Sequence, residues 1–265
     1  MPLIQIDDIE LAYDSTGSGA PIILVHGYPF NRSLWTDQVA VLSGKYRVIS
    51  VDLRGFGESS GSEAPASMSR MAQDLALLMD HLEISEAALV GLSMGGYVLL
   101  SFYKQFPNRV TALVLADTRA SADSEEGKKV RAEQAKTILA EGMAATADAM
   151  LPKLLTPETV AKRVDIVKRV RDMMLRTKPE GAAAALMGMA NREDQTELLP
   201  QINCPTLILV GRADPITPVA DSELMQQKIK SSELHVIERA AHVSNIEQVE
   251  EFNDSLVTFL EKGMR

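Results

Sequence analysis

One serine of the chain stands in a pattern that suits a nucleophile. In AALVGLSMGG (residues 87–96), a short apolar run is followed by Gly91-x-Ser93-x-Gly95 and then by a helical pattern. A serine on a sharp strand-to-helix turn projects its hydroxyl from the carboxyl edge of a sheet, and glycines on both sides leave room for this turn. The first N–H groups of the following helix are free to stabilise a developing negative charge. We therefore expect Ser93 to be the nucleophile.

The same pattern occurs a second time, as Gly57-x-Ser59-x-Gly61. This match follows a turn-like segment and precedes SEAPAS, so it has no strand pattern before it and no helical pattern directly after it. We expect Ser59 to be a loop serine. The alternative for Ser93 is a serine that only caps a helix.

A serine hydroxyl needs a base, and the four histidines differ in their surroundings. His26 belongs to an HG turn, His81 to a helical pattern and His235 to a strand-like run (ELHVIE). His242 follows that run in the loop AAHVSN, where a side chain can reach the edge of a sheet that carries Ser93. The sequence predicts His242 as the base, the alternative being a solvated loop histidine.

An acid is expected to hold the far nitrogen of the imidazole. Asp214 in GRADPITP directly follows the apolar run TLILV and lies between Ser93 and His242 in the chain. Asp117, after ALVLA, is the rival, with capping of a turn as its alternative role. Two backbone N–H groups are expected to hold the oxyanion. These belong to Met94, directly after the nucleophile, and to Tyr28 in the HGYP segment.

Apolar runs that end at Gly or Asp alternate with helical patterns along the chain. Such runs are typical of strands buried on both faces of a parallel sheet. They occupy residues 22–25, 46–51, 87–90, 112–116 and 206–210. Helices are predicted at 67–82 and 246–260, the latter with Asn245 as N-cap and Gln248 completing a capping box. The alternation indicates a doubly wound α/β fold.

The pattern changes between residues 120 and 200, where no strand is predicted. We interpret 120–200 as a helical lid of roughly four helices, separated at Pro152, Pro157 and Pro179, inserted into an α/β core of residues 1–119 and 201–265. An unrelated helical decoration is the alternative.

The lid composition predicts an apolar acyl pocket. The lid has no aromatic residue but holds Met143, Met150, Met173, Met174, Met187 and Met189. Aromatic contacts to a substrate are then expected from Tyr28, Phe30, Trp35 and Tyr97 of the core. No cation is expected near the substrate unless Arg163, Arg171 or Arg192 turns inward.

Bulk composition excludes several classes of partner. A net charge of −9 and a pI near 5.1 disfavour nucleic acid and anionic lipid. The single cysteine, Cys204, excludes an intrachain disulfide. No apolar stretch approaches the roughly 18 residues that span a membrane, and the N-terminus lacks a signal-peptide pattern. We expect a cytoplasmic protein without metal or organic cofactor.

Five motifs in order resemble the α/β-hydrolase superfamily over nearly the whole chain. They are HGYP (26–29), DLRGFGES (52–59), GLSMGG (91–96), GRADPITP (211–218) and AAHVSNIEQ (240–248). The resemblance implies a lid between core strands six and seven, Ser93, Asp214 and His242 as a triad, and Tyr28 and Met94 as oxyanion donors. It is closest to small bacterial esterases, 3-oxoadipate enol-lactonases and cofactor-free haloperoxidases and perhydrolases. Gln248 departs from the proline that often follows the last acidic residue.

The expected activity is hydrolysis of a small, fairly apolar carboxylic ester or lactone through an acyl-serine intermediate. A C–C bond hydrolase and a perhydrolase with the same triad are alternatives. A small-molecule receptor with slow hydrolysis is the alternative from another class. Haloalkane dehalogenases and epoxide hydrolases are excluded, because they carry an aspartate where this chain has Ser93.

Overall fold

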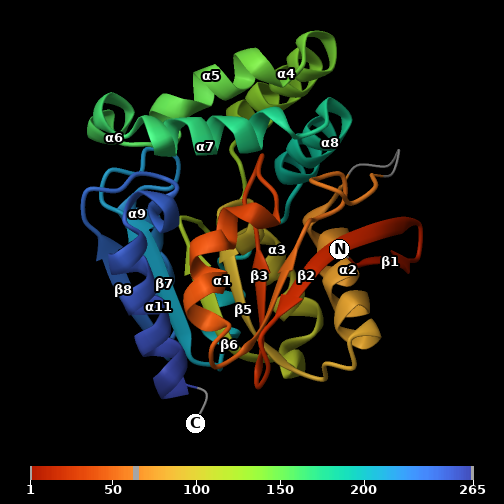
Figure 1. The fold of residues 1–265 in the computed structure, drawn as a ribbon, viewed down its shortest axis with the longest axis vertical. Helices are drawn as coiled ribbons and strands as arrows, with labels where there is room; N and C mark the ends of the chain where they lie inside the picture. The colour runs from red at the N-terminus through yellow and green to blue at the C-terminus, as the bar shows by residue number, and fades with distance from the viewer. Residues whose placement is uncertain (1, 62–65, 264–265) are drawn as a thin grey trace.

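Buried strands form a single sheet at the centre of the molecule (Figure 1). The computed structural model describes residues 2–61 and 66–263, and within them eight strands lie in the order β1-β2-β4-β3-β5-β6-β7-β8. The β1–β2 and β2–β4 pairs are antiparallel, and all later pairs are parallel. The strands are β1 (Leu3–Ile6), β2 (Ile9–Thr16), β3 (Pro21–Val25), β4 (Arg47–Val51), β5 (Ala87–Leu92), β6 (Val110–Ala116), β7 (Thr206–Gly211) and β8 (Ser232–Ile237). The five strands predicted from apolar runs are confirmed as β3 to β7.

Helices cover both faces of the sheet, which explains why the central strands are apolar throughout. Successive side chains of a strand point to opposite faces. Ile23 and Val25 of β3 therefore belong to one apolar cluster, and Ile22 and Leu24 to another. The first cluster includes α2 (Met68–His81), α3 (Met94–Gln105) and α9 (Val219–Lys228), and the second includes α1 (Thr36–Leu42) and α11 (Val249–Gly263).

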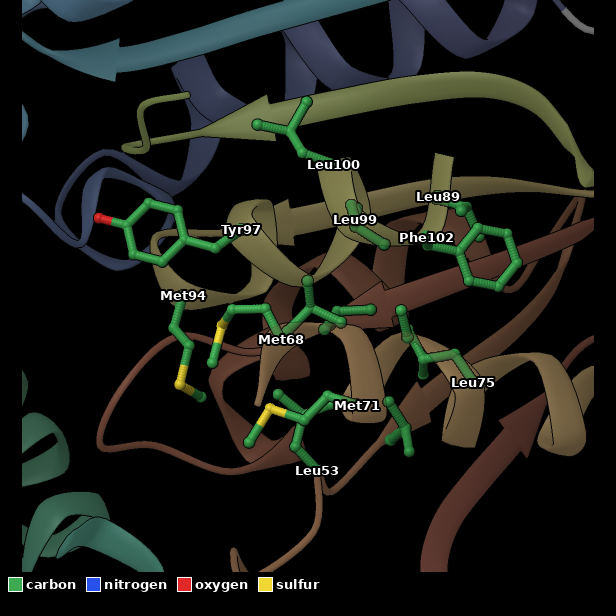
Figure 2. Close-up of a cluster of buried hydrophobic side chains, with 14 of the residues drawn as sticks. Leu53, Met68, Met71, Leu75, Leu89, Met94, Tyr97, Leu99, Leu100 and Phe102 are labelled. Atoms are coloured by element: carbon green, nitrogen blue, oxygen red, sulfur yellow. The ribbon is translucent and has the colours of Figure 1, made fainter. Parts of the chain in front are cut away.

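The first cluster supports the helix that carries the candidate nucleophile. Figure 2 shows Met68 and Met71 of α2 gathered near Leu99 of α3. Phe102 of α3 is fully buried in the same cluster. This packing holds α3, and with it the turn at its N-terminal end, rigidly against the sheet.

The chain between β6 and β7 folds into helices that lie over one end of the sheet (Figure 1). They are α4 (Glu125–Glu141), α5 (Met143–Leu154), α6 (Pro157–Lys162), α7 (Val164–Leu175) and α8 (Pro179–Ala190). Pro157 and Pro179 each begin a helix, as expected. The expectation for Pro152 is wrong, because this residue lies inside α5. It stands in the last turn, where the helix ends two residues later in any case.

The predicted C-terminal helix is divided in two. α10 (Ser244–Glu247) and α11 are separated at Gln248, which has φ −129° and ψ 64°. Asn245 is therefore not the N-cap of a long helix, and that prediction is wrong. Its amide is buried and donates to the Leu34 carbonyl at 3.1 Å and to Gln38 Oε1 at 3.2 Å. The demands of this buried bridge to α1 outweigh the capping pattern.

Gly181 of α8 is expected to be essential for docking of the inserted helices. A Cβ atom at Gly181 would lie 1.9 Å from the carbonyl oxygen of Gly55. We predict that Gly181→Ala lowers the free energy of unfolding by about 1–3 kcal/mol, because contact with backbone cannot be relieved by a side-chain rotation. Urea denaturation measures this change.

Gly127 provides a matched control, since it also stands third in its helix. A Cβ atom at Gly127 would have its nearest neighbour at 3.4 Å, which is ordinary contact. Gly127→Ala should then raise stability by up to about 1 kcal/mol through the better helix propensity of alanine. Equal effects of the two substitutions would refute the packing argument.

Candidate active site

Ser93 occupies a strained turn between β5 and α3. Its φ of 55° and ψ of −113° are unusual for a non-glycine residue. The flanking glycines make this turn possible: a Cβ atom at Gly95 would lie 2.2 Å from the Val25 carbonyl oxygen, and one at Gly91 would lie 2.7 Å from the Gly95 carbonyl carbon. The Ser93 N–H donates to the Ala116 carbonyl at 2.8 Å and so ties the turn to β6.

Ser93, His242 and Asp214 form one chain of hydrogen bonds. His242 Nε2 lies 2.8 Å from Ser93 Oγ, and His242 Nδ1 lies 2.7 Å from Asp214 Oδ2. All three side chains are buried. Asp214 also accepts hydrogen bonds from the Ile216 N–H at 2.8 Å and the Thr217 hydroxyl at 2.6 Å, so the turn after β7 fixes its orientation. The structure thus brings together the three residues selected from the sequence.

The charges of Asp214 and His242 determine which imidazole nitrogen carries the proton. Burial lowers the pKa of His242, but the Asp214 carboxylate outweighs it, and the pKa lies above its ordinary value. Burial raises the pKa of Asp214, but the His242 charge and the hydrogen bonds outweigh it, and the pKa lies below its ordinary value. An ionised Asp214 accepts a hydrogen bond from the N–H at Nδ1 of His242. The other ring nitrogen, Nε2, then carries a lone pair directed at Ser93 Oγ.

Asp117, the rival acid, hydrogen-bonds other partners than the imidazole of His242 and has a different role. Its Oδ1 accepts the Gly211 N–H at 2.8 Å and its Oδ2 accepts the Ser244 hydroxyl at 2.5 Å. Burial, reinforced by the negative charge of Asp214, raises the pKa of Asp117 to about 8. Asp117 therefore joins the ends of β6 and β7 to the loop that carries His242.

The other candidates from the sequence lie away from this chain of hydrogen bonds. Ser59 Oγ donates to the Asp52 carbonyl at 2.6 Å and accepts the Ala12 N–H at 2.9 Å, so it is a buried structural link. His26 is fully buried, with Nε2 accepting the Leu53 N–H at 3.0 Å. His81 and His235 are exposed on α2 and β8.

Two backbone N–H groups in the segments next to Ser93 have no acceptor among the described residues, as expected of oxyanion donors. Met94 is the first residue of α3, so its N–H has no acceptor within the helix. Among the described residues, the N–H of Tyr28 donates to no acceptor either. Gly27 allows the Tyr28 loop to approach the nucleophile, because a Cβ atom there would lie 3.3 Å from Ser93 Cβ and 3.0 Å from the Leu92 carbonyl oxygen.

A cavity of about 260 Å³ opens beside Ser93 and His242. Its apolar lining comprises Val130, Met150, Leu186, Met189 and Ile216, and its aromatic lining is Tyr28 and Tyr97. Phe30 and Trp35 do not line it, contrary to expectation, because they are fully buried beside α1 and α11 on the opposite face. In the described part of the chain, no group of three or more His, Cys, Asp or Glu side chains could hold a metal ion.

Cations also line this cavity, which lid composition did not predict. Arg119, Arg131 and Lys153 contribute to its wall. Arg163 and Arg171 are instead surface residues, paired with Asp165 and Asp148. The position of Arg119 directly after β6 could have indicated it from the sequence. Residues that follow parallel strands meet at the functional edge of the sheet. No spacing rule points to Arg131 on α4.

Arg192 does turn inward, but into an ion pair rather than into this cavity. Its Nη1 lies 2.9 Å from Asp123 Oδ1, and its guanidinium carbon lies 4.2 Å from the centre of the Tyr97 ring. Burial raises the pKa of Asp123, but the hydrogen bonds and charges of Arg131 and Arg192 outweigh it, so the pKa lies below its ordinary value.

The inserted helices are fastened to both loops that reach the cavity. Glu247 Oε2 accepts the Ala241 N–H at 2.6 Å, and Glu247 Oε1 accepts the Thr156 N–H at 2.8 Å. The Thr177 hydroxyl donates to the Pro29 carbonyl at 2.7 Å. The positions of His242 and Tyr28 therefore depend on contacts with the inserted segment.

Comparison with known proteins agrees with this geometry. Residues 20–249 match the family described as the alpha/beta hydrolase fold. The chain belongs to the α/β-hydrolase family. A thermophilic esterase from Thermogutta terrifontis, with malate bound, is 43% identical, with a TM-score of 0.94 over 96% of this chain and 94% of that one.

Two enol-lactonases are also similar to this α/β-hydrolase. The structure of the enol-lactonase from Burkholderia xenovorans LB400 is 31% identical, with a TM-score of 0.92 over 98% of this chain and 100% of that one. The 3-oxoadipate enol-lactonase 1 of Acinetobacter baylyi is 32% identical over 87% of this chain and 85% of that protein. The resemblance inferred from the five motifs is confirmed.

The imidazole of His242 should titrate above its ordinary value of 6.5. Asp214→Asn should lower the pKa of His242, because it removes the negative charge that favours the imidazolium. Asp117→Asn should lower it less, since Asp117 is a smaller contributor to the shift. Titration of histidine signals by NMR measures both changes, and an unchanged pKa in Asp214→Asn would contradict the electrostatic assignment.

Proposed function

We propose that this protein is a serine hydrolase that cleaves a small carboxylic ester or lactone through an acyl-Ser93 intermediate. The observation that carries the proposal is the hydrogen-bonded chain from Asp214 through His242 to Ser93 beside a small cavity. A nucleophile, a base and an orienting acid in this order are the requirements for acyl transfer.

The comparisons support the broad activity. The chain is an α/β-hydrolase whose similar proteins include an esterase and enol-lactonases. Ester hydrolysis and lactone hydrolysis both break the bond between an acyl carbon and an oxygen. The chain is therefore a carboxylic-ester hydrolase in the general sense. The finer choice of substrate rests on the cavity.

Acylation begins with proton transfer to the neutral imidazole. His242 Nε2 takes the proton of Ser93 Oγ as this oxygen attacks the substrate carbonyl carbon. The carbonyl oxygen becomes an anion and is held by the N–H groups of Tyr28 and Met94. The tetrahedral intermediate collapses when the C–O bond to the alcohol breaks. The imidazolium gives its proton to the departing alkoxide, which leaves acyl-Ser93.

Deacylation repeats the same steps with water. His242 removes a proton from a water molecule, which attacks the acyl carbon and forms a second oxyanion in the same two-donor site. The Ser93 Oγ departs and regains its proton from His242, releasing the acid. In a lactone the alcohol remains joined to the acid, so one open-chain hydroxy acid is the product.

Residues 120–200 would act as a lid over a core of residues 1–119 and 201–265. Helices α4, α5 and α8 contribute side chains to the wall of the cavity opposite Ser93, which is the position expected of a lid. The partner would be a small ester or lactone. None of the helices in residues 2–61 and 66–263 combines the length and the apolar character needed to cross a membrane.

Ser93→Ala should abolish turnover of p-nitrophenyl acetate, because no other residue in the cavity is activated by His242. A serine-directed phosphonate should label Ser93 in the wild type, and mass spectrometry of the labelled peptide locates it. Ser59→Ala, which removes the structural serine, is the control for labelling. Labelling of Ser59, or a single burst without further turnover by the wild type, would contradict the proposal, and the burst would favour a receptor.

Asp214→Asn should reduce kcat by about ten-thousandfold if it follows the protease precedent, because an amide stabilises the wrong imidazole tautomer. Asp117→Asn should reduce it far less, since Asp117 hydrogen-bonds Gly211 and Ser244. Steady-state kinetics on p-nitrophenyl acetate compares the two variants. A larger loss in Asp117→Asn would assign the acid to the position after β6.

A further inference from the structure

Glu247 is a buried carboxylate that is bonded to the loop of His242. Its Oε2 accepts the Ala241 N–H at 2.6 Å, and its Oε1 accepts both the N–H of Thr156 at 2.8 Å and the Thr156 hydroxyl at 2.9 Å. The Glu247 residue is 4% exposed, and within the described part of the chain it forms no ion pair. Burial of a carboxylate without a cation is costly, so the three donors gathered here call for an explanation.

The loop of His242 is attached to the inserted segment on both sides of the imidazole. The residue before His242 donates its N–H to Glu247, and the residue after it, Val243, donates its N–H to the Leu154 carbonyl at 3.2 Å. Leu154 is the last residue of α5, and Thr156 follows it closely. Both attachments therefore lead to the C-terminal end of the same helix.

The end of α5 is packed firmly enough to serve as a fixed reference. Leu154 and Leu155 are 0% and 1% exposed and belong to the second apolar cluster. Ala241, in contrast, contributes only a methyl group to packing, so its N–H bond to Glu247 is a main constraint on the backbone directly before His242. Loss of this bond should leave α5 in place and release the loop.

The same helix forms part of the wall of the active-site cavity. Its side chains at this wall are those of Thr146, Met150 and Lys153. Helix α5 thus contacts the space for the substrate and, through Glu247, holds the backbone that carries the imidazole. A single element then sets the distance between the bound acyl group and the base.

We infer that Glu247 is a positioning residue for His242, which directs Nε2 at Ser93 by joining the loop of the base to α5. The inference rests on the proposed function, because it assigns to His242 the role of the base. Glu247 contacts no reacting atom and acts only through the loop. The Nε2 atom lies 2.8 Å from Ser93 Oγ, and a displacement of about 1 Å at such a site can reduce the rate by about 100-fold.

Both oxygens of Glu247 must accept hydrogen bonds, so an amide of equal size cannot replace it. The side chain of glutamine offers one oxygen and one NH2 group. Whichever way the amide is turned, its NH2 group faces an N–H donor, either that of Ala241 or that of Thr156. Glu247→Gln should therefore break one side of the bridge while it preserves the volume of the side chain.

Steady-state hydrolysis of p-nitrophenyl acetate by Glu247→Gln tests the inference. Rates are expressed per Ser93 labelled at completion by the serine-directed phosphonate, so unfolded protein does not count. Both kcat and kcat/KM should fall together by about 10- to 100-fold, because a misplaced base affects the transition state and Glu247 does not contact the substrate. A raised KM with wild-type kcat would overturn the inference, since Glu247 would then only shape the cavity.

Glu251→Gln is the matched control, with the same substitution in the same part of the chain. Glu251 Oε1 also accepts a backbone N–H, that of Glu238 after β8, at 3.2 Å. This bond joins α11 to the exit of β8 and does not involve the inserted helices. Glu251→Gln should keep kcat within about twofold of the wild type. Equal losses in Glu247→Gln and Glu251→Gln would overturn the inference.

Thr156→Val tests the bridge from its other end and decides the matter if Glu247→Gln does not fold. It removes the hydroxyl bond to Glu247 but keeps the backbone bond, so kcat should fall by about 3- to 10-fold. Thr156→Ser retains a hydroxyl and should restore most of kcat. Thr156 also caps α6 by accepting the Thr159 N–H, and Ser124→Ala, which removes the cap of α4, is the control for that loss. An unchanged kcat in Thr156→Val, or an equal loss in Ser124→Ala, would contradict the inference.

NMR reports the placement of the imidazole without turnover. The proton at Nδ1 of His242 lies in the hydrogen bond to Asp214, and its 1H signal depends on the geometry of that bond. The signal should move in Glu247→Gln and keep its wild-type position in Glu251→Gln. A change in stability alone would leave the signal of the folded protein unchanged, so an unmoved signal in Glu247→Gln would also overturn the inference.

These measurements separate the inference from the proposed function. If the wild type hydrolyses p-nitrophenyl acetate and Glu247→Gln does so equally well, only the positioning role fails. If the wild type does not turn over this ester, the proposed function fails. The Nδ1 signal in Glu247→Gln and Glu251→Gln then still decides whether Glu247 positions the imidazole.

Discussion

The turn at Ser93 requires several segments of backbone to pass within van der Waals distance of one another. Gly95 packs directly on the end of β3 at Val25, and Gly96 packs on Thr118 after β6, where a Cβ atom would lie 2.4 Å from the hydroxyl oxygen. The Thr118 hydroxyl donates to the Ser93 carbonyl at 2.8 Å. The unusual backbone of Ser93 persists because the ends of β3, β5 and β6 all hold it, and a parallel sheet places these ends along one edge.

Burial and hydrogen-bond partners then set the pKa values of the acids at this edge of the sheet. Asp214 and Asp117 both follow strands and both lie near His242, yet their surroundings give them opposite tendencies. Asp214 faces a cation and several donors, so its pKa lies low, whereas the buried Asp117 beside Asp214 has a pKa near 8. Burial therefore disfavours the negative charge of Asp117, whereas the partners of Asp214 favour its negative charge. The two acids are distinguished by their partners rather than by their distance along the chain.

Much of the fold and the central hydrogen-bonded chain could be predicted from the sequence, because both depend on local patterns. Short apolar runs predict β3 to β7, and Ser93 and Asp214 directly follow two of these strands. The features that could not be predicted depend on long-range packing. Asn245 lies inside the short helix α10 instead of capping a long helix, and its amide meets Gln38 from the other end of the chain. The Asp123 cluster joins the exit of β6, helix α4 and the chain after α8, and no spacing rule relates these segments.

The anchors of the inserted helices also bear on how a ligand reaches Ser93. The Glu247–Thr156 and Thr177–Pro29 hydrogen bonds fasten the ends of α5 and α7 to the loops of His242 and Tyr28, so moving these ends would disturb the positions of these two residues. A second cavity, of about 520 Å³, lies between α4 and α5. It shares with the active-site cavity the lining residues Val130, Gln134, Thr146, Met150 and Lys153. The two spaces therefore adjoin, and these five residues of α4 and α5 form the wall that they share. Lys153 belongs to this shared wall, so its positive charge contributes to the electrostatic potential in both spaces.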